Sequence, residues 1–248
     1  MFRDIGKLAI LIWRTWCALP LVFRQARKVI EQLFDIGYAS LFMACLLSIF
    51  IGGVLAIQTG PPMVEQGLSS VVGAVVGLSV CKELAPVMMS VLIAGRIGSA
   101  MAAEIGSMSV YQEIDALRTM NINPVHYLVL PRVIAVCIAL PCLVVFSDLI
   151  GWVGGAVVSA TNPDINISWQ SYFTSLANSV DGGDVINGLI KSLIFAGIIG
   201  FISCHQGLMT RGGPRGIGRS VTKAVVNSII LILITDYFAS RLLLRLDL

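Results

Sequence analysis

The chain has 248 residues, of which 56% are hydrophobic and only 12% are charged, with a formal net charge of +3. Soluble domains carry about 25% charged residues, and a soluble core could not bury this much apolar surface. Composition therefore excludes an ordinary soluble domain and indicates a polytopic, all-α membrane protein. The small net charge gives no argument for nucleic-acid binding.

Residues 1–35 alternate basic and apolar side chains, and no uninterrupted apolar run reaches the length of a span, about 20 residues. Basic residues mixed with Trp13, Trp16 and leucines predict amphipathic helices that lie in the membrane interface, with Pro20 separating two pieces. The start lacks a small-residue cleavage site, so we expect no removed signal peptide. We expect 1–35 to be an interfacial segment and 36–248 to be the membrane domain.

Five candidate membrane spans follow, each with more apolar length than a buried helix of a soluble protein. The second span is interrupted by Lys82 and Glu83. The expected spans are 38–58, 70–95, 133–159, 185–205 and 225–244.

The charges between the spans predict the orientation of the chain. The N-terminal segment and the loop 206–224 are rich in Lys and Arg, whereas the loops 59–69 and 160–184 have none. The positive-inside rule then places the N-terminus, the polar segment 95–124 and the loop 206–224 in the cytoplasm. Because five is an odd number of spans, the C-terminus is expected on the side opposite to the N-terminus, outside the cytoplasm.

The polar segment 95–124, between the second and third spans, carries charges that lipid cannot solvate together, so it faces water or another protein. These charges are Arg96, Glu104, Glu113, Asp115 and Arg118. Arg96 and Glu104 are eight residues apart, about 12 Å in a continuous helix. We therefore expect each to pair with another element, such as the loop 206–224.

A short helix, 110–120, is predicted inside this polar segment. Ser109 and Gln112 have the spacing of a capping box, and Asp115 with Arg118 has the spacing of an i,i+3 ion pair. Asn121 and the residues after it end the helix. The pattern alone leaves two interpretations open, a solvated connector between spans and a docking helix.

Ionisable residues inside the spans are costly, at roughly 2.5–3.5 kcal/mol each on insertion scales, so they face the bundle interior or a wet cavity. For each of them, ion pairing that fixes helix packing and a role in transport remain open. The residues are Lys82, Glu83, Asp148, Lys191 and Asp236. Glycine pairs at GxxxG spacing, Gly73–Gly77 and Gly151–Gly155, allow close helix packing, within the chain or in a dimer.

Other motifs carry no chemistry. Residues 213–220 imitate a phosphate loop, but Arg219 replaces the required Lys and no strand precedes the segment, which favours a basic loop near anionic headgroups. We therefore expect no nucleotide site in this chain. His126 and His205 lack metal-site spacing, so we expect no metal, and no catalytic set is present.

The run KELAPV…AGRIGSAMAAEIGSM…EIDALRTMNINP resembles the signature of the MlaE/YrbE permease family, from about residue 36 to the end. That family forms the membrane subunits of MCE-type ABC transporters, which move phospholipids between bacterial membranes; it also occurs in chloroplast envelopes. The resemblance implies a homodimer in the bacterial inner membrane that maintains lipid asymmetry. It also implies a separate cytoplasmic ATPase, which holds ATP and Mg²⁺, and a periplasmic MCE-domain partner.

The resemblance also implies roles for individual residues. It makes the segment 110–120 a coupling helix that docks into a groove of the ATPase through Tyr111, Glu113, Asp115, Leu117 and Arg118. It places four residues near the transport route: Lys82, which stands where the family has Arg, with Glu83, Lys191 and Asp236. In one arrangement Lys191 neutralises Glu83 or Asp236 and changes partner during transport. Asp148 has no recognised counterpart.

A substrate pocket is expected between two copies, on the periplasmic side, lined by the outer half of the first span with Leu55 and Gln58 and by the fifth span. Two further classes remain open. One is an ion-coupled carrier that uses Glu83 and Asp236 as proton sites. The other is an intramembrane enzyme, for which the sequence lacks a catalytic set.

Overall fold

A computed structural model describes residues 2–18 and 26–245, and it has no strand within those ranges. The predicted all-α class is therefore confirmed for this part of the chain. The expected break at Pro20 lies outside the described residues.

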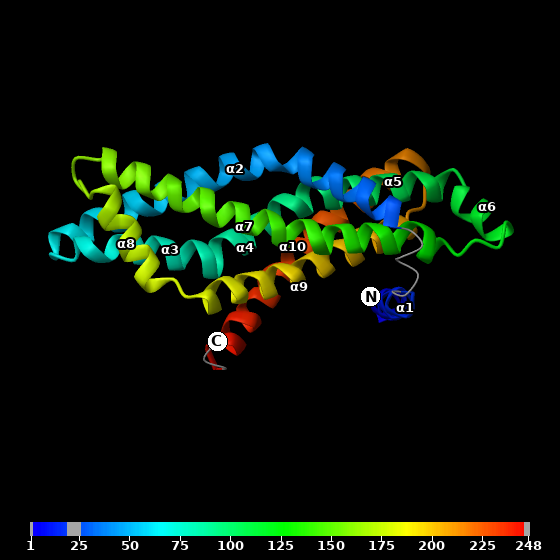
Figure 1. Ribbon diagram of the computed structural model, residues 1–248. Helices are drawn as coiled ribbons and strands as arrows, with labels where there is room; N and C mark the ends of the chain where they lie inside the picture. The colour runs from blue at the N-terminus through cyan, green and yellow to red at the C-terminus, as the bar shows by residue number, and fades with distance from the viewer. Residues whose placement is uncertain (1, 19–25, 246–248) are drawn as a thin grey trace. The chain divides into compact units, whose positions relative to one another are not determined.

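The helices follow one another with short connections (Figure 1). The α-helices are α1 (Phe2–Cys17), α2 (Ala26–Glu65), α3 (Val72–Ser79), α4 (Ala85–Ile93), α5 (Ser99–Val110), α6 (Glu113–Thr119), α7 (Leu130–Thr161), α8 (Trp169–Ser179), α9 (Gly182–Leu208) and α10 (Gly213–Arg245). A 3₁₀ turn, η2 (Ser69–Val71), precedes α3. The π-helical turns in the described part of the chain are η3 (Val80–Leu84), η4 (Ala94–Gly98) and η5 (Val125–Val129).

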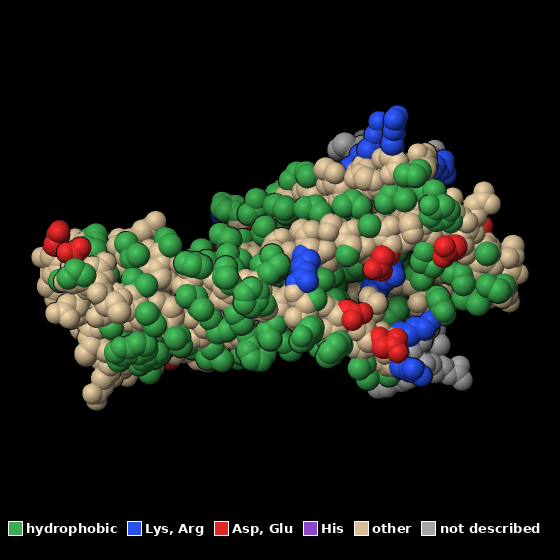
Figure 2. All heavy atoms as spheres, turned by 90° about the horizontal axis from the view of Figure 1, so that it is seen from above, with side chains coloured by type: hydrophobic (Ala, Val, Ile, Leu, Met, Phe, Trp, Pro, Cys, Tyr) green, Lys and Arg blue, Asp and Glu red, His purple; other side chains and the backbone are tan. Residues whose placement is uncertain are grey.

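Within the residues that the structure describes, five helical stretches are long and apolar enough to cross a membrane, which confirms the predicted number of spans. They are Ala26–Glu65, Ser69–Val110, Val125–Thr161, Gly182–Leu208 and Gly213–Leu243. Each is longer than its predicted span, because the helices continue past the apolar run into polar sequence. The second amphipathic piece expected within 1–35 forms the start of α2. Apolar side chains cover much of the surface visible in Figure 2, as contact with lipid requires.

The chain divides into two compact units. Unit 1 comprises Met1–Ala39, Ser90–Leu140 and Leu193–Thr235, and unit 2 comprises Ser40–Met89, Pro141–Ser192 and Asp236–Leu248.

In unit 2 the glycine pairs serve packing inside the chain. A Cβ on Gly73 would strike the Tyr172 carbonyl of α8, and one on Gly77 would lie 3.0 Å from the Leu176 side chain. A Cβ on Gly52 of α2 would strike the Gly151 carbonyl of α7. The small residues therefore let α3 approach α8, beside it in Figure 1, and let α7 approach α2.

In unit 1 similar close approaches join α5 to α9. A Cβ on Gly207 of α9 would lie 2.7 Å from the Ile105 side chain, and one on Gly106 of α5 would lie 3.0 Å from the Thr210 hydroxyl. This packing supports the short helix α6 that follows α5.

The prediction of a loop at 206–224 is wrong. α9 continues to Leu208 and α10 begins at Gly213, so only four residues connect them, and Gly212 and Gly213 make the turn with positive φ. The residues that imitate a phosphate loop form the first turns of α10. This helix offers no loop that could surround a phosphate.

Candidate functional site

Lys191 is the centre of a charge cluster in unit 2. Its side chain is only 3% exposed, and its Nζ donates to Glu83 Oε1 at 2.8 Å, to Ser240 Oγ at 2.7 Å and to the Lys82 carbonyl oxygen at 3.0 Å. Asp236 Oδ1 lies 3.4 Å from the same nitrogen. Lys191 therefore pairs with both carboxylates that the sequence proposed as alternatives.

Local sequence explains why the Lys82 carbonyl accepts this bond. Pro86 lies four residues after Lys82 and has no N–H to give that carbonyl its usual α-helical bond. The π-helical turn η3 lies at the same place, and the Ala85 N–H bonds the Val80 carbonyl five residues back. Turns of this kind are rare and occur often at functional sites.

Gly188 brings α9 close enough to η3 for Lys191 to reach. An ideal Cβ on Gly188 would lie 2.6 Å from the Cys81 carbonyl oxygen, which is backbone and cannot rotate away. Gly188 and Lys191 are three residues apart and share one face of α9. The glycine therefore sets the helix spacing on which the cluster depends.

Gly188→Ala is expected to destabilise the folded protein by about 1–3 kcal/mol, because the added methyl group overpacks the contact with η3. The midpoint of thermal unfolding in detergent measures this effect. Gly197→Ala, on the same helix, is the matched control, because a Cβ there meets nothing within 4 Å. Alanine also has the higher helix propensity, so the control should keep or raise the midpoint. Equal midpoints for the two variants would refute the role given to Gly188.

A second ion pair extends the cluster. Lys82 Nζ lies 2.7 Å from Asp184 Oδ1, and the Asp184 side chain is largely buried. Two cations, Lys82 and Lys191, therefore face three carboxylates, those of Glu83, Asp184 and Asp236. With all five ionised the cluster carries a net charge of −1, and Glu83, at 47% exposure, is its most accessible acid.

Sequence reasoning missed two members of the cluster. Asp184 lies at the end of the segment 160–184, which the sequence predicts to be a loop, and Ser240 is not among the predicted site residues. Asp184 lies seven residues before Lys191 on α9, and Ser240 lies four residues after Asp236 on α10. These helical spacings place each pair on one face and could have indicated them.

Asp148 is buried in unit 2, beside the Cys81 side chain, and its Oδ1 has no hydrogen-bond partner among the described residues. The neighbouring Ser147 hydroxyl lies 2.8 Å from that of Ser48 and ties α7 to α2. Of the expected pocket residues, Gln58 is exposed and Leu55 is half-buried on α2.

The short helix α6 presents most of its predicted docking residues to the outside. Tyr111, just before the helix, is 69% exposed, and Glu113, Asp115 and Arg118 are exposed, whereas Leu117 is half-buried. Arg118 Nη1 lies 3.0 Å from Asp115 Oδ1, which confirms the predicted i,i+3 ion pair. Ile114 alone among the helix residues is buried.

The predicted capping box is wrong. Ser109 still belongs to α5, and its hydroxyl donates to the Thr210 carbonyl at 3.3 Å. Gln112 precedes α6 in the left-handed conformation with φ 61° and makes no side-chain cap. Asn121, with φ 60°, follows the helix as predicted. The helix thus begins at Glu113, three residues later than expected.

Glu104 pairs with Arg132 of α7 at 2.8 Å and not with the segment 206–224. Arg132 is largely buried, so this ion pair fixes the middle of α5 against the start of α7. Together with the hydrogen bond from Ser109 to Thr210, this ion pair holds α5, the helix that directly precedes α6, in place.

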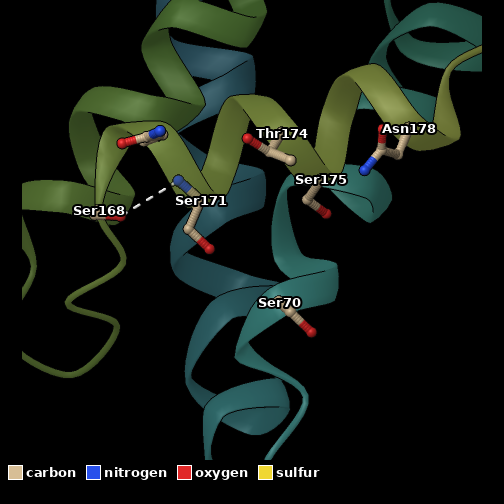
Figure 3. Close-up of a pocket in the computed structure, with 7 residues that line it drawn as sticks. Ser70, Ser168, Ser171, Thr174, Ser175 and Asn178 are labelled. Carbon is tan, nitrogen blue, oxygen red and sulfur yellow. Dashed lines mark hydrogen bonds between the residues drawn. The ribbon is translucent and has the colours of Figure 1, made fainter.

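A shallow cavity of about 440 Å³ lies beside α8 in unit 2 (Figure 3). Its lining is uncharged and polar. Ser168 caps α8 by accepting from the Ser171 N–H, and Ser175 accepts from the Ala74 N–H at 3.1 Å. These two serines thus serve the local structure.

Five apolar spans, a charge cluster paired within them and an exposed short helix between the second and third spans define a multi-pass membrane protein built for transport. The chain belongs to the MlaE permease family, whose pattern, described as Permease MlaE, matches residues 29–242. It is a membrane-embedded ABC permease and a transport subunit, not an enzyme.

Several relatives agree with this assignment. A probable ABC transporter permease protein of Rickettsia bellii is 42% identical over 98% of this chain and 93% of its own length. One from Synechocystis sp. is 42% identical over 88% of this chain and 82% of its own. The chloroplastic protein TRIGALACTOSYLDIACYLGLYCEROL 1 of Arabidopsis thaliana is 38% identical over 86% of this chain and 61% of its own.

Proposed function

We propose that this chain is the permease of an ATP-driven transporter that moves phospholipids between the bacterial inner membrane and the periplasm or outer membrane, and so maintains lipid asymmetry. ABC permeases among its relatives support the ATP-driven class. The Arabidopsis relative is named after a lipid, trigalactosyldiacylglycerol, which supports a lipid substrate.

The exposed helix α6 is the observation that carries the proposal. The preceding helix, α5, is fixed by bonds from its residues Ser109 and Glu104. The outward face of α6 presents Tyr111 and three charged side chains. A fixed preceding helix and an exposed face of aromatic and charged side chains are suited to binding a partner protein and transmitting its movement to the spans. The partner in this proposal is a cytoplasmic ABC ATPase that binds ATP and Mg²⁺.

The remaining assembly follows from the same proposal. Two copies of the chain form a homodimer, and an MCE-domain protein receives lipid on the periplasmic side. The distribution of Lys and Arg supports a cytoplasmic N-terminus and a periplasmic C-terminus. Leu55 and Gln58 on α2 line the lipid pocket between the copies.

In this proposal the Lys191 cluster lies beside the transport route and responds to the conformational change. Two carboxylates share one ammonium group, so Lys191 can shift between Glu83 and Asp236 with little change in its burial. The half-exposed Glu83 is the acid that water or a lipid headgroup reaches most easily.

Glu83→Gln is expected to slow ATP-dependent lipid movement at least tenfold while the complex still assembles. Glutamine keeps an oxygen that can accept from Lys191, but it removes the charge that competes with Asp236 for that group. Lipid movement in proteoliposomes and subunit recovery measure the two effects. Glu65→Gln, at the exposed end of α2, is the control. Wild-type transport and coupled ATPase rates in Glu83→Gln would show that the proposed role is wrong.

Affinity purification of the chain in mild detergent, followed by mass spectrometry of proteins and lipids, tests the assignment. We expect recovery of an ABC ATPase and phospholipid. Well-folded protein that brings neither would contradict the proposed function.

A further inference from the structure

A second cavity lies within unit 1, between α1, α9 and α10, with a volume of about 600 Å³. Its lining has two halves of different chemistry. Lys223 and Asn227 of α10 and Gln206 of α9 supply polar groups, whereas Leu8 of α1 and Ile230 of α10 supply apolar surface. A ligand that fits both halves must itself be amphipathic.

Positive charge around this cavity lacks a counter-charge in the neighbouring sequence. The segment 193–235 contains no Asp or Glu. It contains four cations, Arg211, Arg215, Arg219 and Lys223. None of them forms an ion pair with another side chain that the structure describes, those of residues 6–18, 26–243 and 245. No described side chain of the protein therefore balances the charge of Lys223.

Helix α1 indicates the depth of the cavity relative to the bilayer. It is amphipathic, and its Trp13 and Trp16 side chains are 73% and 65% exposed. Exposed tryptophans are typical of the boundary between headgroups and hydrocarbon. Lys7 Nζ lies 3.7 Å from the Met209 sulfur, which lines the cavity, so a second ammonium group lies at its rim.

The apolar half continues along a span. Ile230 and Leu231 of α10 line the cavity and are 49% and 40% exposed, within the span Gly213–Leu243. Hydrocarbon in contact with these side chains would run directly from the polar half of the cavity into the apolar part of the helix.

We propose that this cavity binds one anionic phospholipid of the surrounding leaflet, with the phosphate at Lys223 and an acyl chain along Ile230 and Leu231. The lipid completes the contact of α1 with α9 and α10 and is resident, not transported. An acidic protein surface would satisfy Lys223, but it would leave the apolar half unfilled. The proposal does not depend on the transported substrate.

The test compares lipid binding by the full chain, purified with its partners into nanodiscs. Native mass spectrometry measures retained phosphatidylglycerol against phosphatidylcholine. Lys223→Gln removes the charge in the cavity, and Asn227→Trp fills the polar half without changing charge. Arg215→Gln, two turns earlier on α10 and outside the lining, removes the same charge and is the matched control.

We expect wild type to prefer phosphatidylglycerol. Lys223→Gln should lower that preference about fivefold, the effect of one lysine near an anionic surface. Asn227→Trp should lower it similarly, and Arg215→Gln should leave it unchanged. Lipid bound on a separate transport route would be retained in all variants and so can be recognised.

Four results would overturn the proposal. Equal losses in Lys223→Gln and Arg215→Gln would show a diffuse surface potential, and an unchanged preference in both cavity variants would place any lipid elsewhere. Loss of a protein subunit from Lys223→Gln with lipid preference intact would make the ligand a protein. Displacement of the lipid by inorganic phosphate would make it a free anion.

Discussion

Lys191→Met is expected to destabilise the folded protein by about 3 kcal/mol, because it leaves two partly buried carboxylate groups without their cation. Lys191 is 3% exposed and pairs with Glu83 and Asp236. We expect the low end of the range for broken buried pairs, since Glu83 is half-exposed and water screens part of its charge. The midpoint of thermal unfolding in detergent measures the loss.

A double variant separates two causes of the lost stability, the loss of side-chain packing and the carboxylate charge left without a cation. Lys191→Met combined with Glu83→Gln should recover part of the midpoint, because one unpaired acid is removed. Arg27→Gln is the control, since its pair with Glu31 is exposed and contributes about 0.5 kcal/mol or less. If Lys191→Met unfolds at the wild-type temperature, the cluster does not stabilise the fold.

Asp115→Arg is expected to lower retention of the ATPase at least tenfold while the chain still inserts in the membrane. The substitution reverses an exposed charge at the centre of the proposed docking face and places a second cation beside Arg118. Charge reversal at an interface costs several kcal/mol, whereas its effect on an exposed helix is small. Co-purification of the ATPase with the permease measures the loss.

The matched control is Glu31→Arg, which also reverses an exposed carboxylate beside an arginine. It should keep the ATPase. The swap Asp115→Arg with Arg118→Asp restores the pair within the helix but not the pattern seen by a partner, so it should remain defective. Full retention in Asp115→Arg would exclude this face as the docking surface.

The spans could be predicted from sequence because lipid demands long apolar helices that satisfy their own backbone. Their ends could not, because α2 and α10 continue into basic sequence that hydropathy does not recognise as helical. The loop predicted for 206–224 failed for this reason.

The cluster was predictable in part. A charged side chain inside the membrane is costly in free energy, and this cost identifies Lys191, Glu83 and Asp236 as groups that need partners. The Lys82 carbonyl could not be foreseen as a partner, because its availability depends on Pro86 and the π-helical turn together. Likewise, Ser109 and Gln112 fit a capping box locally, but the bond from Ser109 to Thr210 of a distant segment takes precedence.

Lipid movement by the reconstituted complex tests the central claim most directly, since it separates an ATP-driven permease from a carrier that uses Glu83 and Asp236 as proton sites. Labelled phospholipid is followed in proteoliposomes with ATP or with an imposed proton gradient. We predict movement that requires ATP and is unaffected by a proton ionophore. Movement that follows the gradient, ceases with the ionophore and ignores ATP would contradict the account.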